Sequence, residues 1–285
     1  MSNPSCSEPV GANPAPILVV CLPEAQPLAQ KLALTLGGEL TLVELRGFED
    51  GEFKVRPTLD PAGLACVVVG LLHGDAYHSP QNRRTQPFDP VSLRYLAQLL
   101  EVVGTDSVAT IEVHQPAAFD NAFRIPARYL PGHQLLAEQV VQGLPPSDKR
   151  ALVVASPDPG GIKRAQFWQA ILDAELDPLG HSAQVGFATV DKRRSLDRVS
   201  GETLACGDVQ GATVLMIDDL LVSGNALARA SEAFRRAGAR RIIAAVVHDL
   251  STPDAFERLE AAGIERLITG DTIPPRPCGP PCPPR

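Results

Sequence analysis

Continuous apolar runs, separated by segments with a helical period, constrain the fold of this chain more than any other feature. Such runs are typical of strands that are buried on both faces, as in parallel sheets covered by helices. We therefore predict an α/β fold built from mostly parallel sheets flanked by helices. The runs that carry this prediction are PILVVCL (16–22), LACVVVGLL (64–72), ALVVAS (151–156), TVLMIDD (213–219) and RRIIAAVVHDL (240–250).

The alternation of strands and helices occurs twice along the chain, which predicts two domains of related topology. The segment PPSDKR (145–150) would join them. We expect an N-terminal α/β domain over 15–146 and a C-terminal α/β domain over 147–273, with a disordered tail over 1–14. Residues 274–285 form a tail rich in proline and cysteine. Its Cys278 and Cys282 lack the second pair that a four-ligand metal site needs, so disorder is the better interpretation.

Composition excludes several classes of function. The 285 residues carry a net charge of −7, which argues against a general binder of nucleic acid or of anionic membranes. No apolar run approaches the roughly 18 residues that a membrane span requires. The N-terminus has no basic start followed by an apolar stretch, so we expect no signal peptide and a cytoplasmic location.

Polar residues follow several of the predicted strands, at the edge where parallel α/β sheets bind their ligands. A single such residue is most often a helix N-cap, but five strands ending in charge or imidazole indicate a shared site. The residues concerned are Glu112 and His114, Asp158 with Gly160 and Gly161, Asp191 to Arg194, Asp218 and Asp219, and His248 with Asp249.

The stretch VLMIDDLLVSGNAL (214–227) has a specific chemical interpretation. Its turn at Ser223, Gly224 and Asn225 leads into a helix, and the free N–H groups of a helix N-terminus attract an anion such as phosphate. Asp218 and Asp219 lie just upstream and could accept hydrogen bonds from a diol. Phosphate and diol together describe a sugar phosphate. The alternative, in which the two aspartates merely cap a loop, stays open on spacing alone.

Several further segments resemble one family, the ribose-phosphate diphosphokinases, which are also called PRPP synthetases and have a type I phosphoribosyltransferase-like fold. The 214–227 stretch itself resembles the ribose-phosphate loop of the phosphoribosyltransferase superfamily. The matches recur in the family's order over most of residues 15–275. They are GFEDGEFKVRP (47–57), DSVATIEVHQPAAFDNAFRIPARYL (106–130), VVASPDPGGIKRA (153–165), DKRRS (191–195) and the segment 244–274.

The resemblance implies transfer of diphosphate from ATP to ribose 5-phosphate, which yields PRPP and AMP. Asp218 and Asp219 would hold the ribose hydroxyls, while His114 and Asp158 would help to hold Mg²⁺. Lys192 and Arg194 would close over the transition state and supply positive charge. The 5-phosphate would be wrapped by Val222, Ser223, Gly224, Asn225 and Ala226.

The resemblance also places ATP contacts in the N-terminal half. Phe48, Asp50 and Glu52 would reach the adenine from a neighbouring subunit, so a homo-oligomer is implied. Residues 77–90 would form the ATP and pyrophosphate loop, with a remnant of the family's Arg–Gln–Asp–Arg segment at Gln81, Asn82, Arg83 and Arg84.

The sequence departs from the family pattern mainly in this nucleotide half. A helix–strand unit that normally precedes the ATP segment is missing here, which shortens the N-terminal domain. The family's Asp–Leu–His reads Glu112–Val113–His114, and Val222, Asn225 and Ala226 replace residues common in the phosphate loop. Three hypotheses follow: an active ribose-phosphate diphosphokinase, a non-catalytic regulatory homologue that binds a sugar phosphate, or a phosphoribosyltransferase that uses PRPP.

Overall fold

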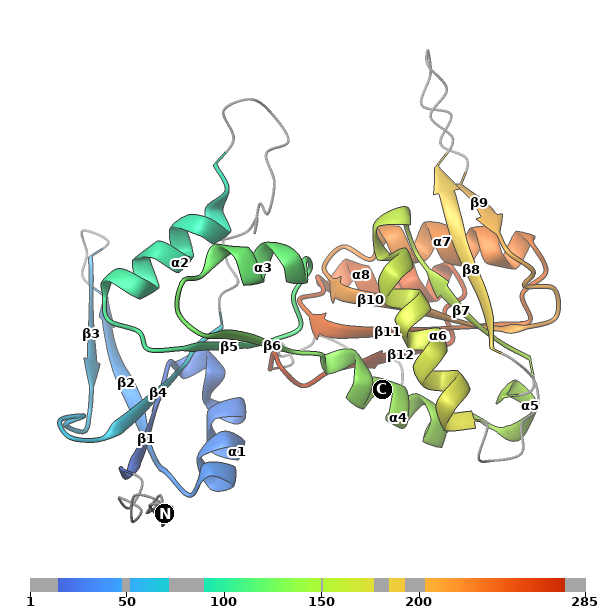
Figure 1. The fold of residues 1–285 in the computed structure, drawn as a ribbon. Helices are drawn as coiled ribbons and strands as arrows, with labels where there is room; N and C mark the ends of the chain where they lie inside the picture. Colours follow the sequence, from blue (N-terminus) through green and yellow to red (C-terminus); the bar gives the residue numbers. More distant parts are fainter. Residues whose placement is uncertain are drawn as a thin grey trace, which may run out of the picture. The chain divides into compact units, whose positions relative to one another are not determined.

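The computed structural model describes residues 15–47, 52–71, 90–149, 151–176, 185–192 and 203–274. The chain falls into two compact units, 1–73 and 74–285 (Figure 1). The domain boundary that we placed near residue 146 is a different division, and it stays a prediction. Among the described residues, none of the helices combines the length and the apolar character that a membrane crossing requires.

The first unit holds a four-stranded sheet in the order β3-β2-β1-β4. The first strand pairs parallel with β2 and β4, and β3 pairs antiparallel with β2, with Gly47 opposite Phe53. Helix α1 packs on β1 and ends where Gly37 adopts a φ of 64°. The elements are β1 (Ile17–Cys21), α1 (Gln26–Leu36), β2 (Glu39–Gly47), β3 (Phe53–Pro57) and β4 (Ala65–Val69).

The second unit is built around a six-stranded sheet in the order β12-β11-β10-β7-β8-β9. All neighbouring pairs are parallel except β8 and β9, which are antiparallel. The strands are β7 (Leu152–Ser156), β8 (Gly186–Lys192), β9 (Thr203–Cys206), β10 (Thr213–Leu221), β11 (Arg241–Asp249) and β12 (Arg266–Thr269). The parallel arrangement confirms the fold class, although we did not predict the edge strand β9.

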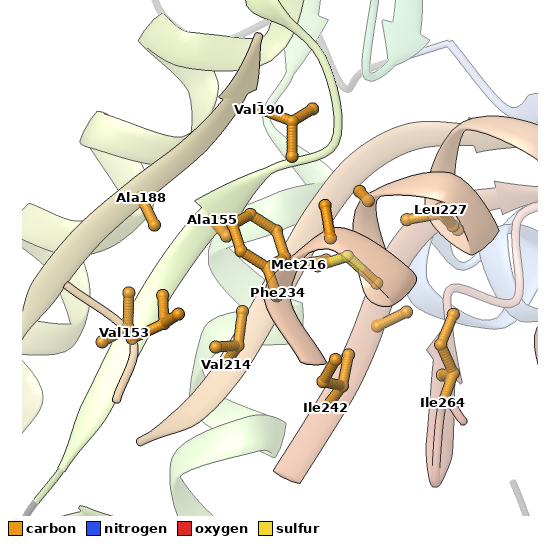
Figure 2. Close-up of a cluster of buried hydrophobic side chains, with 14 of the residues drawn as sticks. Val153, Ala155, Ala188, Val190, Val214, Met216, Leu227, Phe234, Ile242 and Ile264 are labelled. Carbon is orange, nitrogen blue, oxygen red and sulfur yellow. The ribbon is translucent and has the colours of Figure 1, made fainter. Parts of the chain in front are cut away.

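Helices cover both faces of this sheet. They are α4 (Gly132–Gly143), α6 (Ile162–Leu176), α7 (Asn225–Arg236) and α8 (Pro253–Ala261). Successive side chains of a strand point to opposite faces, and β10 follows this rule. Val214 and Met216 join Phe234 of α7 in one buried cluster (Figure 2), whereas Leu215 and Ile217 join a second cluster with α4 and α6. Burial on both faces explains why the strand sequences are apolar throughout.

A two-stranded parallel sheet of β5 and β6 also belongs to the second unit. The strands are β5 (Val108–Ile111) and β6 (Ala127–Leu130), and the helices beside them are α2 (Ser92–Val102) and α3 (Pro116–Ala122). We did not predict β6. Phe119 and Phe123 pack into the small core between these elements. The strand that we expected to end at His114 stops at Ile111, so Glu112 and His114 lie in the loop after it.

The segment that we predicted as a linker contains a short helix, α5 (Pro146–Lys149), with a buried carboxylate. Asp148 bonds to Arg240 at 2.5 Å and to Arg241 at 2.6 Å, at the beginning of β11. Burial alone raises the pKa of Asp148, but the hydrogen bonds from the two arginines outweigh it and hold the pKa below its ordinary value. This ion network ties the segment to the amino ends of the strands.

Replacing Asp148 by asparagine should lower the free energy of unfolding by about 2 kcal/mol at pH 7, because both arginines lose a charged acceptor. A carboxyl with a depressed folded-state pKa stabilises above its unfolded pKa of about 3.9 and loses that contribution as pH falls through the folded value. Urea unfolding at several pH values should therefore show the gap between wild type and Asp148→Asn closing below about pH 4. A gap that is constant with pH would contradict this assignment.

Candidate functional site

The central strand β10 brings most of the described candidate residues to one edge of the six-stranded sheet. We expected β10 to end at the two aspartates. It continues to Leu221, so Asp218 and Asp219 lie within the last four residues of the strand. Neighbouring β7 ends shortly before Asp158, and β11 ends at Asp249. Because β10 pairs parallel with both, these carboxyl ends meet at the same edge.

An arginine that we assigned no role lies at the centre of the site. Arg164, in the first turn of α6, donates through one terminal nitrogen to Asp218 Oδ1 at 3.2 Å. Its other terminal nitrogen lies 3.1 Å from Asp219 Oδ2. Its side chain is 12% exposed, so this fork is largely withdrawn from solvent. One guanidinium therefore orients both carboxylates, an arrangement in which charge-assisted hydrogen bonds are strong.

His114 approaches the same carboxylates from the loop after β5. Its Nδ1 lies 2.8 Å from Asp219 Oδ2, although the two residues are far apart in sequence. This hydrogen bond is the main cause that raises the pKa of His114. The imidazole remains 60% exposed, so it can meet a ligand while it holds Asp219.

The two adjacent aspartates have opposite titration behaviour. Burial, and then the negative charge of Asp219, raise the pKa of Asp218 to about 8. Burial acts on Asp219 in the same direction, but the hydrogen bond from His114 and the charge of Arg164 outweigh it and hold its pKa well below the ordinary value. The surroundings therefore favour the ionised form of Asp219 and the protonated form of Asp218.

A second layer of polar residues lies behind Arg164. Glu112 is only 7% exposed, and its Oε2 lies 2.8 Å from Nδ1 of His133 in α4. Its other carboxylate oxygen lies 3.9 Å from Nε of Arg164. We had noted Glu112 as a polar residue after a strand, but the sequence showed no partner for it. His133 carries no sequence signal, since it lies in an ordinary amphipathic helix.

The turn after β10 leads into a helix, as its sequence predicted, and the left-handed residue is Gly224. Gly224 adopts a φ of 71°, and α7 begins at the next residue, Asn225. The Asn225 N–H points to Ser223 Oγ at 3.4 Å, and the Arg258 guanidinium of α8 donates to the Ser223 carbonyl. Val222, Ser223 and Asn225 are exposed, while Ala226 is half-buried. Backbone N–H groups at the start of α7 are thus presented at the surface beside a cation.

Asp158 lies in the turn between β7 and α6. Its Oδ1 accepts from the Gly161 N–H at 3.1 Å, so one carboxylate oxygen caps this turn. A Cβ on Gly161 would lie 2.6 Å from Ser156 Oγ, which explains why glycine is needed there. Among the described residues, no three His, Cys, Asp or Glu side chains form a group that could hold a metal ion by themselves.

Not all strand-end residues join the site. His248 turns to Thr272, with Nδ1 2.8 Å from its hydroxyl oxygen, and burial lowers the pKa of this imidazole. Asp249 caps the following turn by accepting from the Ser251 N–H at 3.0 Å. Asp249 therefore makes a local contact, whereas His248 also interacts with the backbone of Ile111 and Glu112, which partly offsets the effect of burial on its pKa.

Other candidates fall in parts of the chain that the structure describes only partly. Lys192 is the last residue of β8, and its backbone alone is described. Glu52 is exposed and immediately precedes β3 in the first unit. The remaining candidates lie outside the described residues, and their roles stay predictions: Phe48, Asp50, Gln81, Asn82, Arg83, Arg84 and Arg194.

The chain is similar to known proteins over most of its length. The family model described as "Phosphoribosyl transferase domain" matches residues 134–259. A ribose-phosphate pyrophosphokinase of Thermotoga maritima is 29% identical, with 87% of this chain and 84% of the relative covered. A ribose-phosphate pyrophosphokinase of Streptococcus mutans is 28% identical, covering 86% and 82%. The fold is similar to phosphoribosylpyrophosphate synthetase from Mycobacterium smegmatis, with a TM-score of 0.73 at 23% identity over 91% of this chain and 90% of that one.

Proposed function

We propose that this chain, a divergent member of the ribose-phosphate pyrophosphokinase family, transfers the diphosphate group of ATP to ribose 5-phosphate. The 1-hydroxyl oxygen of the ribose attacks the β-phosphorus, the bond to the α-phosphate oxygen breaks, and AMP leaves as PRPP forms. The observation that carries this proposal is that two oriented carboxylates on β10 are followed, a few residues later, by an exposed helix N-terminus at Asn225.

The carboxylate pair suits the ribose ring. Asp219 is held as an anion by His114 and Arg164, and it offers acceptor lone pairs to a hydroxyl. Asp218 lies beside it at the same strand end. Two neighbouring carboxyl groups of fixed orientation match two neighbouring hydroxyls. In this proposal they position the sugar, and positioning is a main source of rate in phosphoryl-type transfer.

The turn from Val222 to Ala226 would bind the 5-phosphate. The N-cap residue of α7, Gly224, makes no side-chain cap, and the helix dipole favours a negative charge at this end. The guanidinium of Arg258, fixed on the Ser223 carbonyl, adds a cation next to the turn. Sites for a ribose on β10 and for a phosphate in the turn after it, a few residues apart, fit a single sugar-phosphate ligand.

The residues proposed for Mg²⁺ fit that ion in part. Mg²⁺ is usually bound by one or two carboxylates together with waters and substrate phosphates. The Asp158 carboxylate has the required chemistry. His114 uses Nδ1 for Asp219, so it would approach the ion through Nε2 or through water. When bound, Mg²⁺ would neutralise charge on the transferring phosphates.

The remaining parts of the proposal concern ATP. Lys192, at the carboxyl end of β8 and on the same edge as Asp158, would supply positive charge to the transferring group together with Arg194. The segment that includes Gln81 to Arg84 would bind the nucleotide phosphates. Phe48, Asp50 and Glu52 would reach the adenine of a neighbouring copy, which makes a homo-oligomer part of the proposal.

An assay with alternative donors tests the proposed reaction against the other two hypotheses. Incubation with ATP, Mg²⁺ and ribose 5-phosphate should release AMP. Pyrophosphate release from PRPP with one base of a panel, without AMP formation from ATP, would instead indicate a phosphoribosyltransferase. Binding of ribose 5-phosphate without any turnover would indicate a regulatory homologue, and either result would overturn the proposal.

A substitution in the turn tests the phosphate site. Gly224→Ala should lower the affinity for ribose 5-phosphate roughly tenfold, because a Cβ strains the left-handed backbone and would lie 3.2 Å from the Leu259 side chain. Gly211→Ala is a matched control, since Gly211 has a similar φ of 69° but nothing within 4 Å of the added Cβ. Both variants should lose about 1–2 kcal/mol of stability. Equal affinities in calorimetry would remove Gly224 from the phosphate site.

A further inference from the structure

We infer that Glu112 and His133 are positioning residues, which act through Arg164 on the two aspartates that receive the ribose hydroxyls. This inference rests on the proposed function for the identity of the ligand. In this inference, the buried residues Glu112 and His133 fix the orientation of the residues that contact the ligand. Neither residue touches the substrate in this account.

Glu112 is a buried carboxylate, and its two oxygens contact different residues. One oxygen faces the His133 Nδ1 at 2.8 Å and the His133 backbone N–H at 3.4 Å. The other faces Arg164 Nε at 3.9 Å. A buried carboxylate is unfavourable unless it is paired and hydrogen-bonded, and these two contacts supply its partners. The carboxylate therefore links α4 to the guanidinium of α6.

His133 gives this link a fixed orientation. Its Nε2 is buried without a hydrogen-bond partner among the described residues, whereas Nδ1 meets Glu112. The ring packs edge-on to Phe167 at 5.0 Å and lies near Trp168 at 6.5 Å between centroids. An N–H on Nε2 would be buried without an acceptor, so the network assigns the proton to Nδ1. His133 thus donates to one oxygen of Glu112 and leaves the other for Arg164.

The backbone at Glu112 provides an independent sign that its direction matters. Glu112 has a φ of 50°, and it is the one non-glycine residue with positive φ in the described part of the chain. Its N–H donates to the Leu130 carbonyl at 2.8 Å, which holds this unfavourable conformation. Such strain persists where the surroundings over-determine it, and it gathers at functional sites. Here it aims a carboxylate at the guanidinium of Arg164.

Arg164 connects Glu112 to the two aspartates of the site. The guanidinium is planar and its donors form a rigid fork. Nε faces Glu112, and the two terminal nitrogens face Asp218 and Asp219. With three carboxylates around one plane, the loss of the rear carboxylate allows the fork to rotate. The two carboxylates in front would then lose the common orientation that a pair of ribose hydroxyls requires.

The test is Glu112→Gln, which keeps the size of the side chain and removes its charge. Calorimetric titration with ribose 5-phosphate and Mg²⁺, without ATP, should show a dissociation constant raised roughly tenfold. In the full reaction the KM for ribose 5-phosphate should rise similarly while the KM for ATP stays unchanged. Glu112→Asp, which retains the charge, should recover part of the affinity.

Asp148→Asn is the matched control, because it neutralises another buried carboxylate that has two arginine partners. Those partners lie at the amino ends of the strands, away from the proposed site. The control should lower thermal stability and leave the affinity for ribose 5-phosphate unchanged. If wild type binds and Glu112→Gln binds equally well, or if both variants lose affinity in proportion to stability, the positioning role is wrong. If wild type does not bind, the proposed substrate is wrong as well.

Discussion

Replacing Asp219 by asparagine is expected to raise the dissociation constant for ribose 5-phosphate by roughly 100-fold, a loss near the upper range for hydrogen bonds to a charged group. Asp219 accepts a hydrogen bond from His114, forms an ion pair with Arg164, and has a pKa held well below its ordinary value. The substitution therefore removes the negative charge that faces the ligand, and the same charge is lost to the two supporting contacts. Calorimetric titration of wild type and variant with ribose 5-phosphate measures the effect.

ATP, which does not contact Asp219 in the proposed site, supplies the internal comparison. The KM for ATP should change by less than about threefold, because the proposed nucleotide contacts come from other segments. Asp208→Asn is the external control, since the Asp208 carboxylate is exposed and only caps the Gln210 N–H at 3.1 Å. It should change neither constant. Equal losses for ATP and ribose 5-phosphate in Asp219→Asn would contradict the assignment to the sugar.

Replacing Lys192 by alanine is expected to lower kcat by about 1,000-fold, as the removal of a positioned transition-state donor does in other enzymes. Its position at the end of β8 places its backbone at the same sheet edge as the turn of Asp158. In the proposed reaction its charge is needed while the diphosphate moves, and much less when ribose 5-phosphate binds. Steady-state rates of AMP formation and calorimetry separate these two effects.

Lys149→Ala is the control for this prediction. Lys149 belongs to α5, which is tied to the amino ends of the strands through the neighbouring Asp148. Loss of this lysine should leave kcat unchanged, and Lys192→Ala should bind ribose 5-phosphate within about threefold of wild type. A Lys192→Ala variant that keeps most of its rate would remove Lys192 from the catalytic role.

The fold was readable from sequence because burial on both faces leaves a direct mark. In β10, Val214 and Met216 face one covering layer while Leu215 and Ile217 face the other, so the strand is apolar at every position. The edge strand β9 and the short strand β6 lack that mark, since they are only partly buried and each contains polar or exposed residues. Sequence patterns could not distinguish them from loops.

The candidate site was predictable only where it depends on local chemistry. Two adjacent aspartates before a glycine turn are visible in the sequence, and the structure brings them together with His114. Arg164 was not identified, because its meaning comes from contacts with residues more than fifty positions away. Glu112 was noted as a strand-end residue, but its partners Arg164 and His133 were not, since both contacts join separate segments of the chain. Long-range ion pairs of this kind leave no periodic signal.

The most direct test of the account is ³¹P NMR of a mixture of enzyme, ATP, Mg²⁺ and ribose 5-phosphate. The proposed reaction predicts that the resonances of ATP decline while those of AMP and of a new sugar-linked diphosphate rise in equal amounts, and that Lys192→Ala abolishes the change. Formation of ADP with a sugar bisphosphate, or a spectrum that stays the same with folded wild-type protein, would contradict the proposed transfer of diphosphate.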